Sequence, residues 1–247
     1  MTAINKDVNM PERIPLELQM NLEAYRTATA VAEYSTYQLS EEEEYLFGKH
    51  YSAGESVLDL ACGMGRTTLL LHEMGMQVRG VDRSELFIQT ARRRLSYLDL
   101  CVGSYDRIEE ADASFSHVLI SHNSLDCAFP EVQRLAALRE SVRVLKPGGT
   151  LIFSSHNLKS LHWFSLNSDL WRPRWKMRQA LKAFGDSAYV LEEGQHLFYA
   201  SSGYVIQQAA QCGLKLLEAV SFCRIRNLRL GLYMSPYIHY AFAKPAK

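Results

Sequence analysis

A turn rich in glycine is the first feature whose residue types could bind a ligand. The apolar run Val57–Leu60 is followed by Gly63 and Gly65, and a helical pattern begins at Thr67. Glycine permits a sharp turn and lets the backbone approach a ligand where a β-carbon would collide. The spacing therefore predicts a ligand-binding turn between a strand and a helix.

Two acids accompany this turn. Asp59 lies within it, and Asp82 ends the next predicted strand, about 20 residues past the glycines, where an acid can bind two ribose hydroxyls. The spacing Asp59-x-Ala61-x-Gly63-x-Gly65 differs from the Gly-x-Gly-x-x-Gly of dinucleotide sites. An acid here would repel a pyrophosphate but suits a ligand that carries an ammonium and a sulfonium group. The turn predicts a nucleoside site and disfavours a nicotinamide oxidoreductase.

These motifs resemble those of the class I S-adenosylmethionine-dependent methyltransferases, although Ala61 stands where many members have a glycine. The resemblance continues along most of the chain, through predicted strands at 116–121, 214–221 and 237–243, a turn and fifth strand within 145–153, and a helix at 203–213. It implies an α/β fold with a doubly wound, mostly parallel seven-stranded sheet whose last strand is antiparallel. It also implies a methyltransferase of the small-molecule type, with S-adenosyl-L-methionine as the cofactor.

The resemblance further implies a cofactor site at the carboxyl ends of the strands. Asp82 would hold the ribose, and Asp59 would order the turn or bind the methionine ammonium. The loop after the third strand would contact the adenine, with Ser104 where many relatives have an acid and Asp106 as a substitute. The expected cofactor-binding residues are Asp59, Ala61, Gly63, Gly65, Asp82, Arg83, Ser104, Tyr105, Ser121 and Tyr34.

Two histidines follow predicted strands and could act as bases. Positioning is sufficient to methylate an unprotonated amine, whereas a hydroxyl or ring N–H must also lose a proton, for which histidine suits neutral pH. His156, after the fifth strand, is the first candidate and His122, after the fourth, is the second. Either ring could instead bond a backbone group or pack in the core. The methylated atom is expected to be an oxygen or a nitrogen.

Other catalytic motifs are missing. There is no Asn/Asp-Pro-Pro-Tyr motif for methylation of base amines, and Cys127 follows Asp126 rather than the proline of a cytosine-methylating nucleophile. Asp126 alone is thin support for a metal site, since hard cations take several clustered oxygen ligands. We therefore predict no metal ion.

The segment 158–202 is longer than a simple connection and is expected to be an insertion after strand five. It contains every tryptophan of the chain and a basic set in which Arg174, Arg178 and Lys182 would share one face of a helix from Pro173. Two interpretations stay open: a lid that recognises an aromatic or anionic acceptor, or a solvated basic face. The candidate acceptor-binding residues are Asn123, Tyr37, Trp163 and Arg174.

Residues 1–45 are expected to form an N-terminal helical cap. Small-molecule methyltransferases often fold such a helix over the cofactor, so by resemblance Tyr34 or Tyr37 could touch the methionine end or the acceptor. Core packing is the alternative. The acidic run Glu41–Glu44 predicts the start of a solvated helix, since acids stabilise a helix amino terminus.

Composition narrows the function classes. The 247 residues include 27 acidic and 27 basic side chains, so no net charge attracts nucleic acid or a membrane surface. Five scattered cysteines indicate neither a disulfide framework nor a zinc site, and no apolar run reaches the ~20 residues of a membrane span. We expect a single cytoplasmic domain over 1–247 that acts on a small molecule, not on nucleic acid or membranes. A homodimer, an RNA or protein acceptor, and a non-catalytic cofactor-binding role stay open.

Overall fold

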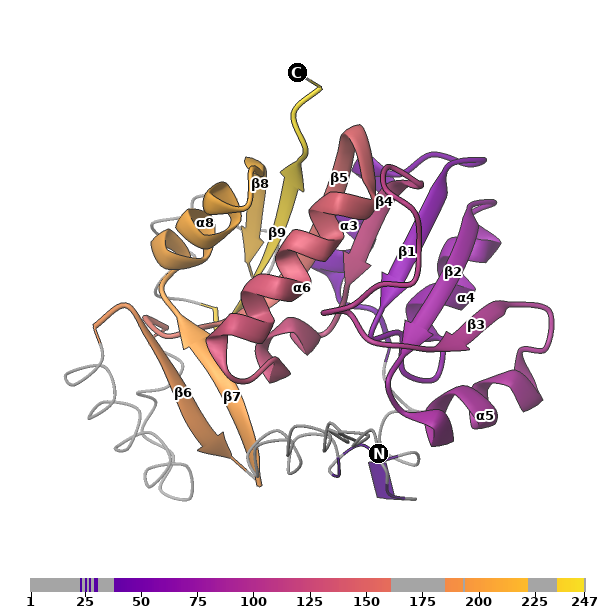
Figure 1. The fold of residues 1–247 in the computed structure, drawn as a ribbon, viewed down its shortest axis with the longest axis horizontal. Helices are drawn as coiled ribbons and strands as arrows, with labels where there is room; N and C mark the ends of the chain where they lie inside the picture. Colours follow the sequence, from indigo (N-terminus) through magenta and orange to yellow (C-terminus); the bar gives the residue numbers. More distant parts are fainter. Residues whose placement is uncertain are drawn as a thin grey trace, which may run out of the picture.

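The computed structural model describes residues 23, 25, 27, 29–30, 38–160, 185–192, 194–221 and 235–246. Figure 1 shows the arrangement of their helices and strands. In chain order these are α3 (Glu41–His50), β1 (Ser56–Leu60), α4 (Arg66–Glu73), β2 (Gln77–Asp82), α5 (Glu85–Arg94), β3 (Asp99–Val102), β4 (Phe115–Ile120), the 3₁₀ helix η1 (Ser124–Cys127), α6 (Glu131–Val144), β5 (Leu145–Asn157), β6 (Ser187–Glu192), β7 (Gln195–Ala200), α8 (Ser202–Gln211), β8 (Lys215–Ser221) and β9 (Tyr237–Ala243).

The described strands form one sheet. Strands β3, β2, β1, β4 and β5 lie side by side and parallel, while β9 runs antiparallel to both β5 and β8. The doubly wound, mostly parallel class I methyltransferase-like sheet is therefore confirmed, including its antiparallel last strand. Parallel strands bring their carboxyl ends to one edge, where such folds bind ligands.

The insertion adds two strands that the sequence analysis did not predict. Strands β6 and β7 form an antiparallel hairpin, and Tyr199 and Ala200 of β7 pair in parallel with His156 and Asn157 of β5. His156 also pairs with Tyr237 of β9. The sheet thus forks at the carboxyl end of β5 and has nine strands among the described residues.

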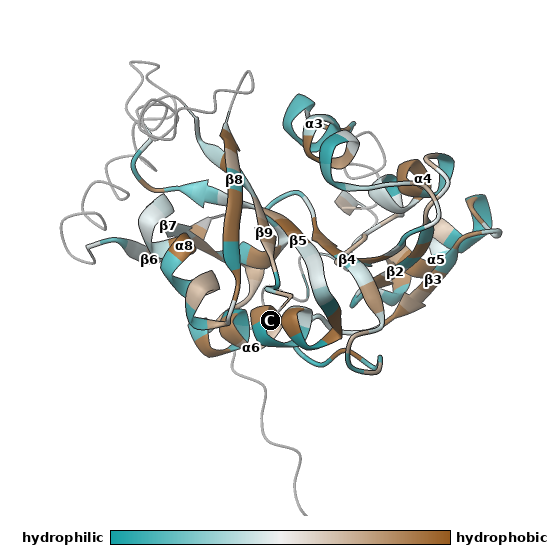
Figure 2. Cartoon of the chain, turned by 90° about the horizontal axis from the view of Figure 1, so that it is seen from above, coloured by the Kyte–Doolittle hydropathy of each residue, from teal (hydrophilic) through white to brown (hydrophobic). Residues whose placement is uncertain are grey.

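Helices cover both faces of this sheet, as Figure 2 shows. Helices α3 and α4 pack on one face, where Phe47 and Leu71 contact Ile152 of β5 within one apolar cluster. Helices α6 and α8 pack on the other face, where Leu138 and Val205 join Phe153. Neighbouring residues of β5 therefore face opposite layers, which is the period-two alternation of a strand.

Helix α3 begins where the acidic run predicted a helix, but the prediction that its acids are solvated is wrong for two of the four. Ser40 caps the helix: its Oγ accepts from the Glu43 N–H at 3.1 Å, and its N–H donates to Glu43 Oε2 at 3.0 Å. Glu42 and Glu43 are buried, with 8% and 4% of their surface exposed. Glu43 tolerates burial because Arg66 pairs with it.

Several sequence predictions fall on residues outside the described part of the chain. These are the acceptor and cofactor contacts of Tyr34, Tyr37, Trp163 and Arg174, the helix from Pro173, and most of the N-terminal cap. Within the described residues, no helix combines the length and the apolar character needed to cross a membrane.

Candidate active site

The turn between β1 and α4 has the conformation that its glycines suggest. Gly63 and Gly65 have φ values of +57° and +83°, in the left-handed region. Ala61 shares this region at +55°, where a residue with a β-carbon is uncommon. A Cβ added at Gly63 would meet, among the described residues, only the Phe87 ring at 3.9 Å. The backbone of Gly63 is therefore open to a ligand.

Asp59 is fully buried beneath this turn. Its Oδ2 accepts hydrogen bonds from Thr67 Oγ1 at 2.7 Å and Thr68 Oγ1 at 2.6 Å. Burial raises the pKa of Asp59 to about 6, although the two threonines oppose the shift. Oδ1 has no hydrogen-bond partner among the residues that the structure describes. Of its two expected roles, these contacts correspond to ordering the turn, because they join β1 to the first turn of α4.

Asp82 lies at the end of β2, next to the turn. Its Oδ2 accepts from the Gly63 N–H at 2.9 Å, and its Oδ1 accepts from the Ser84 N–H at 2.7 Å. Burial raises its pKa, while these two hydrogen bonds lower it. Each carboxylate oxygen can accept a further bond. Both oxygens are therefore held in place with acceptor capacity left for ribose hydroxyls.

The residues expected to contact the adenine lie together after β2 and β3. Arg83 Nε donates to Ser104 Oγ at 2.7 Å, and the guanidinium also pairs with the Asp106 carboxylate. Ser104 Oγ donates to that same carboxylate. The guanidinium carbon of Arg83 lies 4.9 Å from the centre of the Tyr105 ring. The predicted Arg83, Ser104 and Tyr105 are thus brought together, and Ser104 is bonded to its neighbours.

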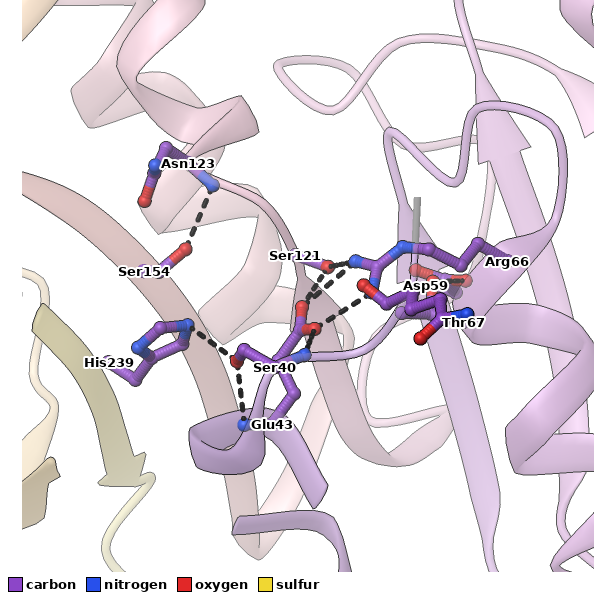
Figure 3. Close-up of polar contacts among 10 residues, drawn as sticks. Ser40, Glu43, Asp59, Arg66, Thr67, Ser121, Asn123, Ser154 and His239 are labelled. Atoms are coloured by element: carbon purple, nitrogen blue, oxygen red, sulfur yellow. Dashed lines mark hydrogen bonds and ion pairs between the residues drawn. The ribbon is translucent and has the colours of Figure 1, made fainter. Parts of the chain in front are cut away.

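A network on the β4 side of the turn was missed by the sequence analysis, apart from Ser121. Arg66 donates to both Glu43 oxygens, at 2.8 and 2.9 Å, and also to Ser121 Oγ. Ser121 Oγ in turn donates to Glu43 (Figure 3). Burial alone would raise the pKa of Glu43, but the Arg66 hydrogen bonds and charge lower it to about 2. The network joins α3, α4 and the end of β4.

His156, the first candidate base, is held by a buried carboxylate. Its backbone N–H donates to Asp126 Oδ2 at 2.7 Å, and its Nδ1 lies 2.7 Å from the same oxygen. Asp126 Oδ1 accepts from Arg134 Nη1 at 2.6 Å and from Ser155 Oγ at 2.8 Å. Asp126 and Arg134 are both fully buried. Neither was predicted, because the sequence places them far from His156.

His122 and Asn123 follow β4 with positive φ values of +52° and +56°. The Asn123 N–H donates to Ser154 Oγ at 2.8 Å (Figure 3), and Ser154 lies opposite His239 in the register of β5 and β9. The His122 side chain is solvent-exposed. Partial desolvation by the surrounding protein, together with the positive charge of Arg66, still lowers its pKa. Burial also lowers the pKa of His239, which the sequence analysis did not select. The electrostatic environment of His122 includes His156 and His239.

The described part of the N-terminal cap crosses the same edge of the sheet. The Tyr25 carbonyl accepts from Ser84 Oγ at 2.9 Å, beside Asp82. The Tyr25 hydroxyl donates to Gln195 of β7 at 2.8 Å and lies 3.2 Å from Cys127 Sγ. Tyr25 therefore bridges the nucleoside side of the site and the insertion hairpin.

The donor set fits the cofactor that the fold implies. The open backbone at Gly63 and the acid Asp82 held beside it both suit the nucleoside part of S-adenosylmethionine. Within the described ranges, no three His, Cys, Asp or Glu side chains are grouped so as to hold a metal ion.

Comparison with known proteins agrees with this geometry. A family model described as a methyltransferase domain matches residues 57–149. A demethylmenaquinone methyltransferase of Beutenbergia cavernae is 37% identical over 99 residues, which are 40% of this chain and 40% of the relative. A cypemycin N-terminal methyltransferase of Streptomyces is 34% identical over 97 residues, or 39% of this chain and 40% of the relative. This chain thus spans about two fifths of these curated relatives.

Among solved structures, the 1,6-didemethyltoxoflavin-N1-methyltransferase of Burkholderia thailandensis, with 1,6-didemethyltoxoflavin and S-adenosylhomocysteine bound, has a TM-score of 0.65. The match covers 99% of this chain and 98% of the other chain. At 15% sequence identity, it shows a similar fold. Together, these comparisons show a methyltransferase domain over residues 57–149 and a class I methyltransferase-like fold.

Proposed function

We propose that this chain transfers a methyl group from S-adenosyl-L-methionine to an oxygen or nitrogen atom of a small molecule. One observation carries the proposal: Asp82 Oδ2 accepts from the Gly63 N–H at 2.9 Å, so the ribose acid and the open glycine turn form one unit. When bound, the cofactor supplies a methyl carbon on a positively charged sulfur. The protein must then hold an acceptor atom about 3 Å from that carbon and exclude water.

In this proposal the expected cofactor residues keep their assigned roles. Asp82 holds the ribose, Ser104 and Tyr105 line the adenine, and Arg83 fixes that loop through its bond to Ser104. Ser121 and Tyr34 are assigned to the methionine end. Asp59 orders the glycine turn rather than touching the cofactor, because its carboxylate is buried against the first turn of α4.

The acceptor side would lie at the ends of β4 and β5, next to the histidines. His156 and His122 are the proposed bases, and Asn123, Tyr37, Trp163 and Arg174 are the proposed acceptor contacts. Support comes from Tyr25, which joins the cap to the hairpin across this edge and so restricts access. The names of two similar proteins, which refer to demethylmenaquinone and didemethyltoxoflavin, agree with a small acceptor.

The same reasoning supports a proposal for the organisation of the chain. We assign residues 1–247 to one methyltransferase domain, with 1–45 as a cap and 158–202 as the insertion that selects the acceptor. Its hairpin pairs directly with the strand that carries His156, which is where an acceptor-selecting element would have to lie.

A labelling experiment tests this function. The purified chain is incubated with methyl-labelled S-adenosylmethionine and an extract of its own cells, and the label is then separated by size. Label in the small-molecule fraction is the expected result. Label in RNA or protein would instead show that the acceptor is a macromolecule; label in protein would agree with the relative named as an N-terminal methyltransferase. Cofactor binding without any transfer would favour a non-catalytic role.

A further inference from the structure

The buried carboxylate of Asp126 has no part in the function as proposed so far. We infer that Asp126 is the positioning residue of His156, and that the methylated atom of the acceptor carries a proton which His156 removes. This inference rests on the proposed function and deepens it, because it selects one base and one class of acceptor. The acceptor class is a hydroxyl or an acidic N–H, such as a phenol, an enol or a ring nitrogen.

The first step is the number of contacts that converge on one carboxylate. Oδ2 accepts two hydrogen bonds from His156, one from its backbone and one from its ring, each at 2.7 Å. Oδ1 accepts from Arg134 at 2.6 Å and from Ser155 at 2.8 Å. Four donors thus fix the carboxylate, and the carboxylate fixes both the backbone and the ring of His156.

The second step is the tautomer of the ring. An ionised carboxylate can only accept hydrogen bonds, so the 2.7 Å contact places a proton on Nδ1 of His156. The neutral ring then carries its lone pair on Nε2, which is the arrangement of a general base. No residue in the described ranges is hydrogen-bonded to Nε2. The ring centre lies 4.5 Å from that of Tyr199 and 5.2 Å from that of Tyr237, which restrict its rotation.

The third step concerns stability. A fully buried ion pair such as Asp126–Arg134 is weak evidence for stability, because desolvation offsets the attraction between its charges. Other contacts also fix the Arg134 side chain. Its Nε donates to Gln208 at 3.2 Å, and its guanidinium carbon lies 4.3 Å from the Phe198 ring centre. Since the pair by itself adds little stability, the buried carboxylate points to a role for the Asp126 charge at His156.

The groups that face His156 come from each neighbouring element. They are Asp126 of η1, Tyr199 of β7 and Tyr237 of β9, with Arg134 of α6 behind Asp126 and the His122 ring within electrostatic range. Asp126 is the acid among them that bonds the ring. It stabilises the imidazolium that forms when Nε2 takes a proton.

The reaction balances with these parts. The acceptor's proton passes to Nε2 of His156, and the acceptor's oxygen or nitrogen forms the new bond to the methyl carbon. The electron pair of the broken carbon–sulfur bond stays on sulfur. The proton leaves His156 to solvent after product release, so the imidazole is restored without any further reactant.

The test uses the full chain and the methyl acceptor isolated by the labelling experiment. In Asp126→Asn we expect kcat to fall by about 100-fold, the loss typical of a general base, while KM and the Kd for S-adenosylhomocysteine change little. The midpoint of the pH–rate profile should move to lower pH, since the imidazolium loses its stabilising charge. Asp112→Asn, at an exposed acid that pairs with Arg143, is the matched control and should behave as the wild type.

Unchanged kcat and an unmoved pH profile in Asp126→Asn would overturn the inference while leaving the proposed function intact. A wild-type chain that binds S-adenosylhomocysteine but methylates nothing would overturn both. Because Asp126→Asn leaves Arg134 buried without its partner, the variant can fail to fold. The double variant Asp126→Asn/Arg134→Met then removes both charges and takes its place in the kinetics.

A second measurement needs no variant of Asp126. Nitrogen-15 spectra of histidine-labelled wild-type protein, with the His156 signals assigned from a His156→Gln variant, report which ring nitrogen carries the proton. The Nδ1–H tautomer is expected for the neutral ring. An Nε2–H tautomer would contradict the assignment of Nε2 as the base.

Discussion

Asp59 and Glu43 show how the partners of a buried acid set its charge. Asp59 accepts from two neutral hydroxyls, and burial raises its pKa to about 6. Glu43 accepts from an arginine, which outweighs burial and lowers its pKa to about 2. The same chemical group therefore stabilises the fold in different pH ranges at the two positions.

Asp59 leads to a prediction about pH. Its folded pKa of about 6 lies above the usual value of 3.8, so the folded state binds the proton more tightly. Its contribution to stability is present below about pH 4 and is lost as pH rises through about 6. In Asp59→Asn, this part of the decline in unfolding free energy between pH 4 and 7 should disappear. Urea unfolding at several pH values measures it, and an unchanged pH dependence would contradict the assignment.

Asp82 leads to a prediction about the cofactor. Removing its carboxylate in Asp82→Ala should weaken S-adenosylhomocysteine binding by about 10- to 100-fold, because hydrogen bonds to a charged group contribute about 1.5 to 3 kcal/mol. Calorimetry measures the loss, and circular dichroism checks that the domain stays folded. Asp99→Ala, at an exposed acid of β3 paired with Arg79, is the control and should bind normally. Wild-type affinity in Asp82→Ala would remove the ribose role.

At the scale of elements, the Glu43–Arg66 pair joins α3 to the helix that follows the glycine turn. Glu43→Gln keeps an acceptor for the Ser40 N–H but leaves Arg66, which is 17% exposed, without its charge partner. We expect the free energy of unfolding at pH 7 to fall by about 2 kcal/mol, below the range for fully buried pairs. Denaturant unfolding measures the change.

The neighbouring Glu44 supplies the control for this prediction. It is exposed, so Glu44→Gln should change stability by less than about 1 kcal/mol. The loss of unfolding free energy in Glu43→Gln should also become smaller at acidic pH. Its folded pKa of about 2 lies below the usual 4.5, so its contribution is present above pH 4.5 and is lost as pH falls toward 2. Equal losses in the two variants at pH 7 would contradict the role of the pair.

The sequence predicted helices and strands correctly where the pattern that marks them lies within a few neighbouring residues. The strand, glycine turn and helix from Val57 to Thr67 were identified because hydrophobic period and turn chemistry lie within ten residues of each other. Glu43 was missed because four consecutive acids look alike. Only the spacing Ser40-x-x-Glu43, a capping box, distinguishes it.

Contacts between distant parts of the chain could not be predicted in this way. Asp126 meets Ser155 and His156 across about 30 residues, and only the fold of η1 against β5 brings them together. The β6–β7 hairpin was missed because tryptophans and basic residues dominate the insertion, which favoured a helix in the analysis. Charge pattern says little about which edge of a sheet a segment joins.

At the scale of the whole molecule, the proposed cofactor site is distributed over β1, β2, β3 and β4, so its occupation should stabilise the entire fold. At a free S-adenosylhomocysteine concentration of 100 times Kd, mass action adds about 2.7 kcal/mol to the unfolding free energy. For a chain of this length that raises Tm by roughly 5 to 10 °C. Thermal unfolding measures the shift. NAD at the same concentration is the control, and a comparable shift with NAD would reopen the oxidoreductase alternative.

The fork at the end of β5 separates the β6–β7 hairpin from the parallel strands β1 to β4. Among the described residues, the hairpin joins the sheet through two residue pairs, beyond the last position at which β4 pairs with β5. Exposed hairpin residues such as Leu191 can therefore change without disturbing the register of β1 to β4, while Phe198 and Tyr199 stay buried against Arg134 and His156. Under the proposed function, in which the insertion selects the acceptor, a change of acceptor would need only a local replacement after Asn157.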